Sequence, residues 1–191
     1  MARTSRQCLI QMSGAPGAGK STIAAELCRR YGMVSLDHDV VKSALLETGS
    51  FADSGPASYE VLIALAEDLL GQGHSVVIDS PCWYDELLAS GQSLGARVGV
   101  PYLYLECRTD DLDVLDARLR GRVARPSQRT SVTASPTDDD RPDSERRDQF
   151  RAWIAGMKRP EADSLVIDTS RDVDDCLGDV EDFLRARGVG S

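Results

Sequence analysis

The feature that most restricts the fold of this chain is a glycine-rich segment near its N-terminus, Gly14-Ala15-Pro16-Gly17-Ala18-Gly19-Lys20-Ser21, which matches the pattern GxxxxGK[ST]. The apolar run Cys8–Met12 precedes it, and a segment with helical spacing, Ser21–Tyr31, follows it. Between a strand and a helix, such glycines let backbone N–H groups turn inward around phosphate oxygens, and the helix adds the positive end of its dipole. The sequence therefore predicts an α/β fold built around a phosphate-binding loop.

Three side chains at the end of this loop are expected to act on a bound nucleotide. We expect Lys20 to reach the β- and γ-phosphates and the Ser21 hydroxyl to bind Mg²⁺, with Thr22 assisting nearby. The chain contains no asparagine, the residue with which guanine-specific switch proteins read their base. The predicted ligand is therefore ATP with Mg²⁺, although the strictness of ATP over GTP stays open.

Apolar runs and helical stretches alternate along the rest of the chain. Further strands are predicted at Met33–Leu36, Ser75–Ile78, Tyr102–Leu105 and Leu165–Ile167. Further helices are predicted at Val40–Thr48, Ser58–Leu70, Asp85–Val98, Asp110–Arg122, Glu145–Met157 and Val173–Arg187. Because strands and helices alternate, the sheet should be parallel and covered on both faces. A chain of 191 residues fits one such domain, which we place at 1–191.

Residues 123–144 interrupt this alternation, because they are rich in Pro, Ser, Thr, Asp and Arg and show no apolar periodicity. The segment is predicted to be too polar for the core, and its composition fits a surface loop and a substrate-closing lid equally. The preceding helix favours the lid, since Arg118 and Arg122 are four residues apart and should share a face, with Arg125 and Arg129 beyond. Such a row is expected to contact the nucleotide through Arg118 and the transferred phosphoryl group through Arg122. Which arginine of the lid makes the phosphoryl contact is left open.

Acidic residues follow two of the predicted strands, at the edge of a parallel sheet where functional groups gather. Asp79 ends an apolar run and is expected to hold Mg²⁺ or its water. Asp39 and Lys42 are one helical turn apart, and Asp39 is predicted to be the general base for an acceptor hydroxyl, with a helix N-cap as its alternative. Asp37 is either a cap, a residue that orients Lys42 or a second candidate for the base. Alternation along an extended segment predicts that His38 points away from both aspartates and is structural.

The pocket for the acceptor is predicted between the helix after the second strand, the Phe51–Tyr59 segment and the residues that follow Asp79. Tyr59, Trp83 and Tyr84 fall there and could stack on a ring of the acceptor, although packing of such residues against the core is commoner.

The net charge and the composition of the chain limit the kinds of molecule that it is expected to bind. A net charge of −9 and a pI near 4.7 oppose attraction to nucleic acid or an anionic membrane, so a small-molecule acceptor is favoured and nucleic acid is not expected. No apolar run is long enough to cross a bilayer. Five widely spaced cysteines without a CxxC pair indicate reduced thiols. Met1–Gln7 lacks the apolar core of a secretory signal, so a cytoplasmic location is expected, as a monomer or homodimer.

Several of these features together resemble the polynucleotide-kinase-like branch of the P-loop kinases, which is itself similar to zeta-toxin and chloramphenicol phosphotransferase proteins. The resemblance is carried by Gly14–Ser21, by Asp39 with Lys42, by Asp79 and by Arg122. It runs from about Cys8 to Arg122 and resumes at Leu165–Thr169.

This resemblance implies ATP-dependent phosphorylation of a hydroxyl and a five-stranded sheet of order 2-3-1-4-5. It also implies that Asp39 is the base and that Lys20 and Arg122 stabilise the transferred charge. Polynucleotide kinases carry an arginine where this chain has Lys42, and lysine lacks the bidentate fork of arginine. We therefore expect a metabolite, nucleoside or antibiotic as acceptor. A kinase of nucleic-acid 5′-hydroxyls and a nucleotide-sensing ATPase without a phosphorylated acceptor are the alternatives.

Overall fold

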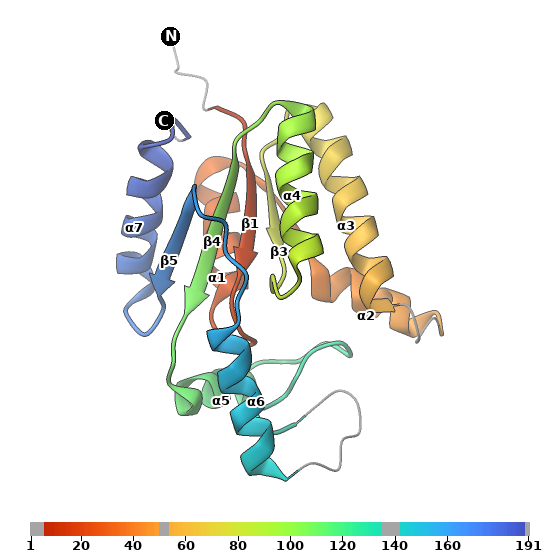
Figure 1. Ribbon diagram of the computed structural model, residues 1–191, viewed down its shortest axis with the longest axis vertical. Coiled ribbons are helices and arrows are strands. Elements are labelled where there is room, and N and C mark those ends of the chain that lie inside the picture. The colour runs from red at the N-terminus through yellow and green to blue at the C-terminus, as the bar shows by residue number, and fades with distance from the viewer. Residues whose placement is uncertain (1–5, 50–53, 135–141, 190–191) are drawn as a thin grey trace.

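A computed structural model of the protein describes residues 6–49, 54–134 and 142–189. Within these residues, five parallel strands form one sheet in the order β2-β3-β1-β4-β5 (Figure 1). The strands are β1 (Leu9–Ser13), β2 (Val34–Asp37), β3 (Val76–Asp79), β4 (Tyr102–Arg108) and β5 (Ser164–Asp168). The predicted α/β class and the strand order are therefore confirmed.

The helices cover both faces of the sheet, as the alternation of the sequence predicts. Those of the described residues are α1 (Lys20–Tyr31), α2 (His38–Glu47), α3 (Ser54–Gly71), α4 (Asp85–Val98), α5 (Leu112–Arg120), α6 (Asp143–Ala155) and α7 (Val173–Arg185). Apolar residues of α1 and α7 pack in one core cluster, and those of α3 and α4 pack in another. Figure 1 shows α5 and α6 beyond the carboxyl ends of the strands. No helix in the described part of the chain combines the length and apolarity that a membrane span requires.

The central strand β1 sends alternate side chains into the two cores. Ile10 and Met12 join the cluster with α1 and α7, whereas Leu9 joins the cluster with α3 and α4. Every residue of β1 is buried. Because β1 is the central strand, the chain must turn away from the sheet between its neighbours where the strand ends. It does so at Gly14, which has a φ of 131° and where a Cβ atom would lie 2.1 Å from the carbonyl oxygen of Cys107 on β4. Only glycine permits this close passage of two backbones.

Two helix boundaries differ from the predicted ones in a way that changes the site. Helix α2 begins at His38 because the Asp37 side chain caps it, accepting a 2.8 Å hydrogen bond from the Asp39 N–H. Helix α5 ends at Arg120, so the prediction that Arg118 and Arg122 share a helix face is wrong. Gly121 is the C-cap of the helix, and the Arg122 side chain beyond it donates a hydrogen bond to the carbonyl oxygen of Arg129.

The composition of the polar segment after α5 predicts that it stays out of the core, and at one residue this prediction is wrong. Val132 is fully buried in the same cluster as Phe150 and Ile154 of α6, and its N–H donates a 2.8 Å hydrogen bond to the Asp116 carboxylate. A single apolar residue produces no periodic signal, which explains why the pattern misses it. Val123 follows the prediction and is fully exposed. Residues 135–141 of the predicted lid lie outside the described residues.

Candidate functional site

A cavity of about 880 Å³ lies at the carboxyl edge of the sheet. Its lining includes nearly all the residues that the sequence predicts for the site: Pro16, Gly17, Gly19, Lys20, Ser21, Thr22, Asp39, Lys42, Tyr59, Asp79, Trp83, Tyr84, Arg118 and Arg122. The predicted residues outside the lining are Gly14, Ala15 and Ala18, which belong to the glycine-rich loop itself. The fold therefore gathers side chains from widely separated parts of the sequence around one space.

The phosphate loop, Gly14–Ser21, curls directly into helix α1. Gly19 precedes the helix in the left-handed region, with a φ of 91°. The Lys20 ammonium donates hydrogen bonds to the carbonyl oxygens of Gly14 and Ala15, at 2.9 and 3.0 Å. Burial lowers the pKa of Lys20, while the nearby Asp79 carboxylate opposes that shift. The loop thus holds a cation at its centre, at the start of a helix whose N–H groups favour anions.

Asp79 and Ser21 form the acidic side of this loop. Asp79 ends β3 and is 5% exposed, and it lines the cavity together with Ser21. Burial raises the pKa of Asp79, and the Lys20 ammonium acts against that rise. A hydroxyl and a carboxylate are the hard oxygen donors that Mg²⁺ takes from proteins, together with water and phosphate oxygens. The residues present therefore fit a nucleotide bound with Mg²⁺.

The Asp39 carboxylate is held by residues that the sequence analysis missed. The Ser127 hydroxyl lies 3.1 Å from Oδ1, and the Gln128 side-chain amide donates to Oδ2 at 2.8 Å. Burial alone would raise the pKa of Asp39, but the hydrogen bonds from Gln128 and Ser127 act against burial, and the pKa lies below its usual range. Asp39 is therefore an ionised hydrogen-bond acceptor at the cavity wall. Because Asp37 supplies the helix cap, the alternative assignment of Asp39 as the cap is wrong.

His38 also turns toward the cavity, so the prediction that it points away from the aspartates is wrong. Its Nδ1 atom is 3.8 Å from Oδ1 of Asp39, and its ring stacks on Tyr59 with centroids 4.3 Å apart. The strand alternation used to place His38 does not apply, because His38 is already the first residue of α2.

The two predicted arginines lie at different parts of the cavity wall. Arg118 donates a 2.7 Å hydrogen bond to the carbonyl oxygen of Thr169, which follows β5. Arg122 donates a 3.0 Å hydrogen bond to the carbonyl oxygen of Arg129. Burial lowers the pKa of Arg122, and the Asp39 carboxylate counteracts that effect. The Arg122 guanidinium is thus electrostatically coupled to Asp39, although it is not on helix α5.

Aromatic side chains also line the cavity, in an arrangement that the sequence predicts only in part. Trp83 stacks on Trp153 of α6, with ring centroids 4.9 Å apart, and the Arg129 guanidinium lies 5.2 Å from the Trp153 ring. Tyr84 is 57% exposed at the surface. Arg129, from the arginine row that the sequence predicts, lines the cavity, and so does Trp153, which carries no motif that separates it from core residues.

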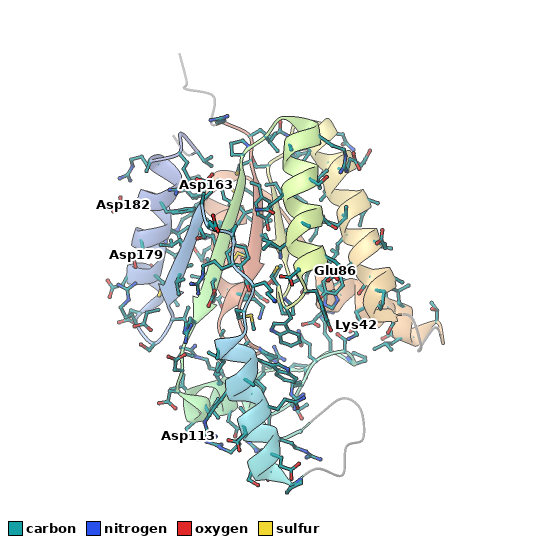
Figure 2. All side chains as sticks on the ribbon, viewed as in Figure 1. Lys42, Glu86, Asp113, Asp163, Asp179 and Asp182 are labelled. Atoms are coloured by element: carbon teal, nitrogen blue, oxygen red, sulfur yellow. The ribbon has the colours of Figure 1, made fainter. Side chains whose placement is uncertain are left out.

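The lining of the cavity carries both signs of charge. Lys42 on α2 and Glu86 on α4 both belong to it. Figure 2 shows them on the same side of the molecule, away from Asp179 and Asp182 on α7. Of the predicted Phe51–Tyr59 boundary, residues 51–53 lie outside the described residues, and Tyr59 lines the wall.

Sequence comparison matches one family. A sequence profile of the family described as "AAA domain" matches residues 9–141 of the chain. No curated protein matches the sequence.

Solved structures share the fold along nearly the whole chain. A candidate kinase from Chloroflexus aurantiacus has a TM-score of 0.71 and 21% identity, covering 93% of this chain and 98% of that one. An APS kinase from Mycobacterium tuberculosis, in complex with AMPPNP and APS, has a TM-score of 0.61 and 20% identity, covering 95% and 99%. A gluconokinase from Sinorhizobium meliloti has a TM-score of 0.60 and 14% identity, covering 96% and 95%.

Proposed function

The chain belongs to the AAA domain family, and from that premise we propose that it is an ATP-dependent phosphotransferase that phosphorylates a hydroxyl of a small molecule. The observation that carries the proposal is the convergence of Lys20, Asp39 and Arg122 on one cavity with the phosphate loop. A nucleotide-binding loop alone fits many activities, whereas an ionised carboxylate facing the same space supplies a base for an acceptor.

At the nucleotide end, the backbone of the phosphate loop and the Lys20 ammonium would hold the β- and γ-phosphates. Ser21 and Asp79 would hold Mg²⁺, which neutralises phosphate charge when bound. Arg118 would contact the nucleotide from the helix that precedes the lid segment. Its hydrogen bond to Thr169 keeps the guanidinium at the cavity wall.

At the acceptor end, Asp39 would accept the proton of the attacking hydroxyl. The hydroxyl oxygen then forms a bond to the γ-phosphorus, the bond from that phosphorus to the bridging oxygen breaks, and ADP leaves with the electron pair. Arg122 would neutralise charge on the transferred group, and the segment around Ser127 and Gln128 would exclude water from the acceptor. Water exclusion favours transfer to the acceptor over hydrolysis.

Two observations support a small acceptor. Solved structures with the same fold include a gluconokinase and an APS kinase, whose names state small-molecule activities. The chain has a net charge of −9, and Lys42 supplies only a point charge for an acceptor phosphate. Among the P-loop kinases, the spacing of Asp39 and Lys42 supports a relationship between this chain and the polynucleotide-kinase-like group.

Substitution of Asp39 by Asn tests the proposal. Acceptor-dependent ADP release should fall by about 100-fold or more, because the amide cannot take the proton, while ATP binding by calorimetry stays close to that of the wild type. The acceptors to screen are nucleosides, antibiotics, sugars, polyols and oligonucleotides with free 5′-hydroxyls. Asp175→Asn, at an exposed position of α7, is the matched control and should not change either measurement.

The same experiment separates the alternatives. A nucleic-acid kinase would respond only to the oligonucleotides, with steeply salt-dependent binding. A sensing ATPase would release ADP without any acceptor and would be indifferent to Asp39→Asn. Either result contradicts a small-molecule kinase.

A further inference from the structure

The His38 imidazole is held by two contacts from α3 and lines the cavity. The residue is 5% exposed and lines the cavity beside Asp39. One face of its ring stacks on Tyr59, and its Nε2 atom lies 2.9 Å from the Ser58 hydroxyl oxygen, both on α3. A histidine held this firmly presents one defined edge to the cavity.

The hydrogen bonds around Ser58 define which ring nitrogen carries the proton. The Ser58 hydroxyl donates its single hydrogen to the carbonyl oxygen of Gly55, at 2.6 Å. Its oxygen can then only accept from His38, so Nε2 of His38 is the N–H nitrogen. In the neutral ring, Nδ1 therefore carries a free lone pair.

This lone pair lies beside a second acceptor. Among the described residues, His38 Nδ1 is a buried atom with no hydrogen-bond partner. Its neighbour is Oδ1 of Asp39, at 3.8 Å, which is too long for a hydrogen bond and is itself an acceptor. Ser127 already donates to Oδ1 of Asp39, so His38 Nδ1 is the buried acceptor of this pair that still lacks a donor.

The charges nearby favour neutral donors. Arg122 is coupled electrostatically to Asp39, and Lys42 lines the same cavity, so the carboxylate already has cationic compensation. Hydroxyls supply hydrogens without adding a further charge. Two adjacent hydroxyls would satisfy Asp39 and His38 together.

We propose that His38 Nδ1 binds the acceptor molecule by accepting a hydrogen bond from a hydroxyl adjacent to the one that Asp39 deprotonates. The acceptor is therefore a vicinal diol, such as a sugar, a polyol or a ribonucleoside. This inference rests on the proposed phosphotransferase function and adds the substrate class. His38 is then a residue that determines acceptor specificity, and Ser58 is a positioning residue that sets its tautomer.

Nitrogen NMR tests the tautomer without any acceptor. The chain has only two histidines, so a His74→Asn variant, altered at an exposed position, assigns the His38 signals of ¹⁵N-labelled protein. Long-range proton–nitrogen spectra at neutral pH should show a protonated Nε2 and an unprotonated Nδ1. A proton on Nδ1 would overturn the proposal, because that atom would then be a donor to Asp39.

Matched acceptor pairs test the binding role. Wild-type protein should use glycerol or adenosine with a kcat/KM on the order of tenfold above that for 1,3-propanediol or 2′-deoxyadenosine, respectively, because the second member of each pair lacks the vicinal diol. His38→Gln can still donate to Ser58 but has no acceptor at the Nδ1 position, so this preference should disappear. The His74→Asn variant should retain it.

The outcomes are distinct. An unchanged preference in a folded His38→Gln variant that still binds ATP would exclude His38 as the group that reads the second hydroxyl. Failure of the proposed function would instead be seen as no acceptor-dependent ADP in wild-type protein, and the acceptor assignment would fail with it. The NMR result would then still show which ring nitrogen of His38 is protonated.

Discussion

The Asp39 carboxylate shows how two opposed effects set the state of one residue. Burial favours the neutral acid, but hydrogen bonds to the charged form from Ser127 and Gln128 act in the opposite direction. The hydrogen bonds prevail, so the carboxylate stays ionised. The same contacts hold its orientation, which a base needs in order to meet an acceptor hydroxyl.

Removing the Gln128 amide should therefore raise the pKa of Asp39 and loosen the orientation of its carboxylate. In Gln128→Ala the pKa of Asp39 rises, because a hydrogen bond that lowers it is lost. The acid limb of the pH profile of kcat/KM should move to higher pH, and kcat/KM at neutral pH should fall on the order of tenfold. Gln72→Ala removes an amide that bonds Asp68 at 2.7 Å on the surface, and should leave the profile unchanged. A profile that moves to lower pH would contradict the assignment.

At this scale the sequence predicts the residues that belong to patterns and misses those that depend on tertiary contact. Lys20 and Asp79 occupy positions that a loop motif and a strand end define, and both line the cavity. Ser127 and Gln128 lie in a polar segment about 90 residues from Asp39, at separations of 88 and 89. No local pattern marks such a contact, because it exists only once α2 and the segment after α5 are folded together.

At the scale of elements, α4 shows how closely a helix can approach the sheet. A Cβ atom at Gly91 would lie 2.5 Å from the Tyr102 ring, and one at Gly95 would lie 3.1 Å from the Tyr102 Cβ. Glycine lowers helix propensity but lets this helix pack directly on β4. On α7, by contrast, nothing lies within 4 Å of a Cβ atom at Gly178.

These two glycines give a matched pair of substitutions with opposite signs. Gly178→Ala should stabilise the protein by about 0.5–1 kcal/mol, since it improves helix propensity without a clash. Gly91→Ala gains the same propensity but overpacks Tyr102, so a net loss of about 1–3 kcal/mol is expected. Denaturant unfolding of both variants measures the difference. Equal effects on stability would show that α4 does not depend on the close approach at Gly91.

The periodicity of the sequence predicts the existence of the elements better than their ends. Helix α3 starts at Ser54 rather than Ser58, and α6 starts at Asp143 rather than Glu145. Apolar spacing marks the buried stretch of a helix, whereas its first turn is set by local hydrogen bonds and contacts. The early start of α2, caused by the Asp37 cap, is what carries His38 into the cavity.

At the scale of the whole molecule, α6 and the residues that follow it contact the rest of the fold through side chains. Trp153 of α6 stacks on Trp83, and Arg159 donates hydrogen bonds at 3.0 and 2.7 Å to Glu106, a carboxylate that is 1% exposed on β4. Strand and helix alternation predicts parallel strands but not their order, which depends on where each crossover returns. The order came from the resemblance to known kinases, while a single domain at 1–191 stays a prediction.

Nucleotide binding should stabilise this whole assembly, because the cavity joins α1, β3 and α5 with the loop after β5. At an ATP concentration of about 100 times Kd, with Mg²⁺ present, linkage adds about 2.7 kcal/mol of stability. For a chain of this size, that corresponds to a rise in Tm of about 5–10 °C.

The lysines of the chain provide the test of where this stabilisation originates. Lys20→Ala removes the ammonium at the centre of the phosphate loop, so the rise in Tm with ATP and Mg²⁺ should be lost. Lys158→Ala removes a partly exposed ion pair with Asp85, at 3.1 Å, and should retain the full rise. Differential scanning calorimetry with and without the nucleotide measures both. If Lys20→Ala kept the rise, ATP would bind away from the phosphate loop, and the cavity would not be the nucleotide site.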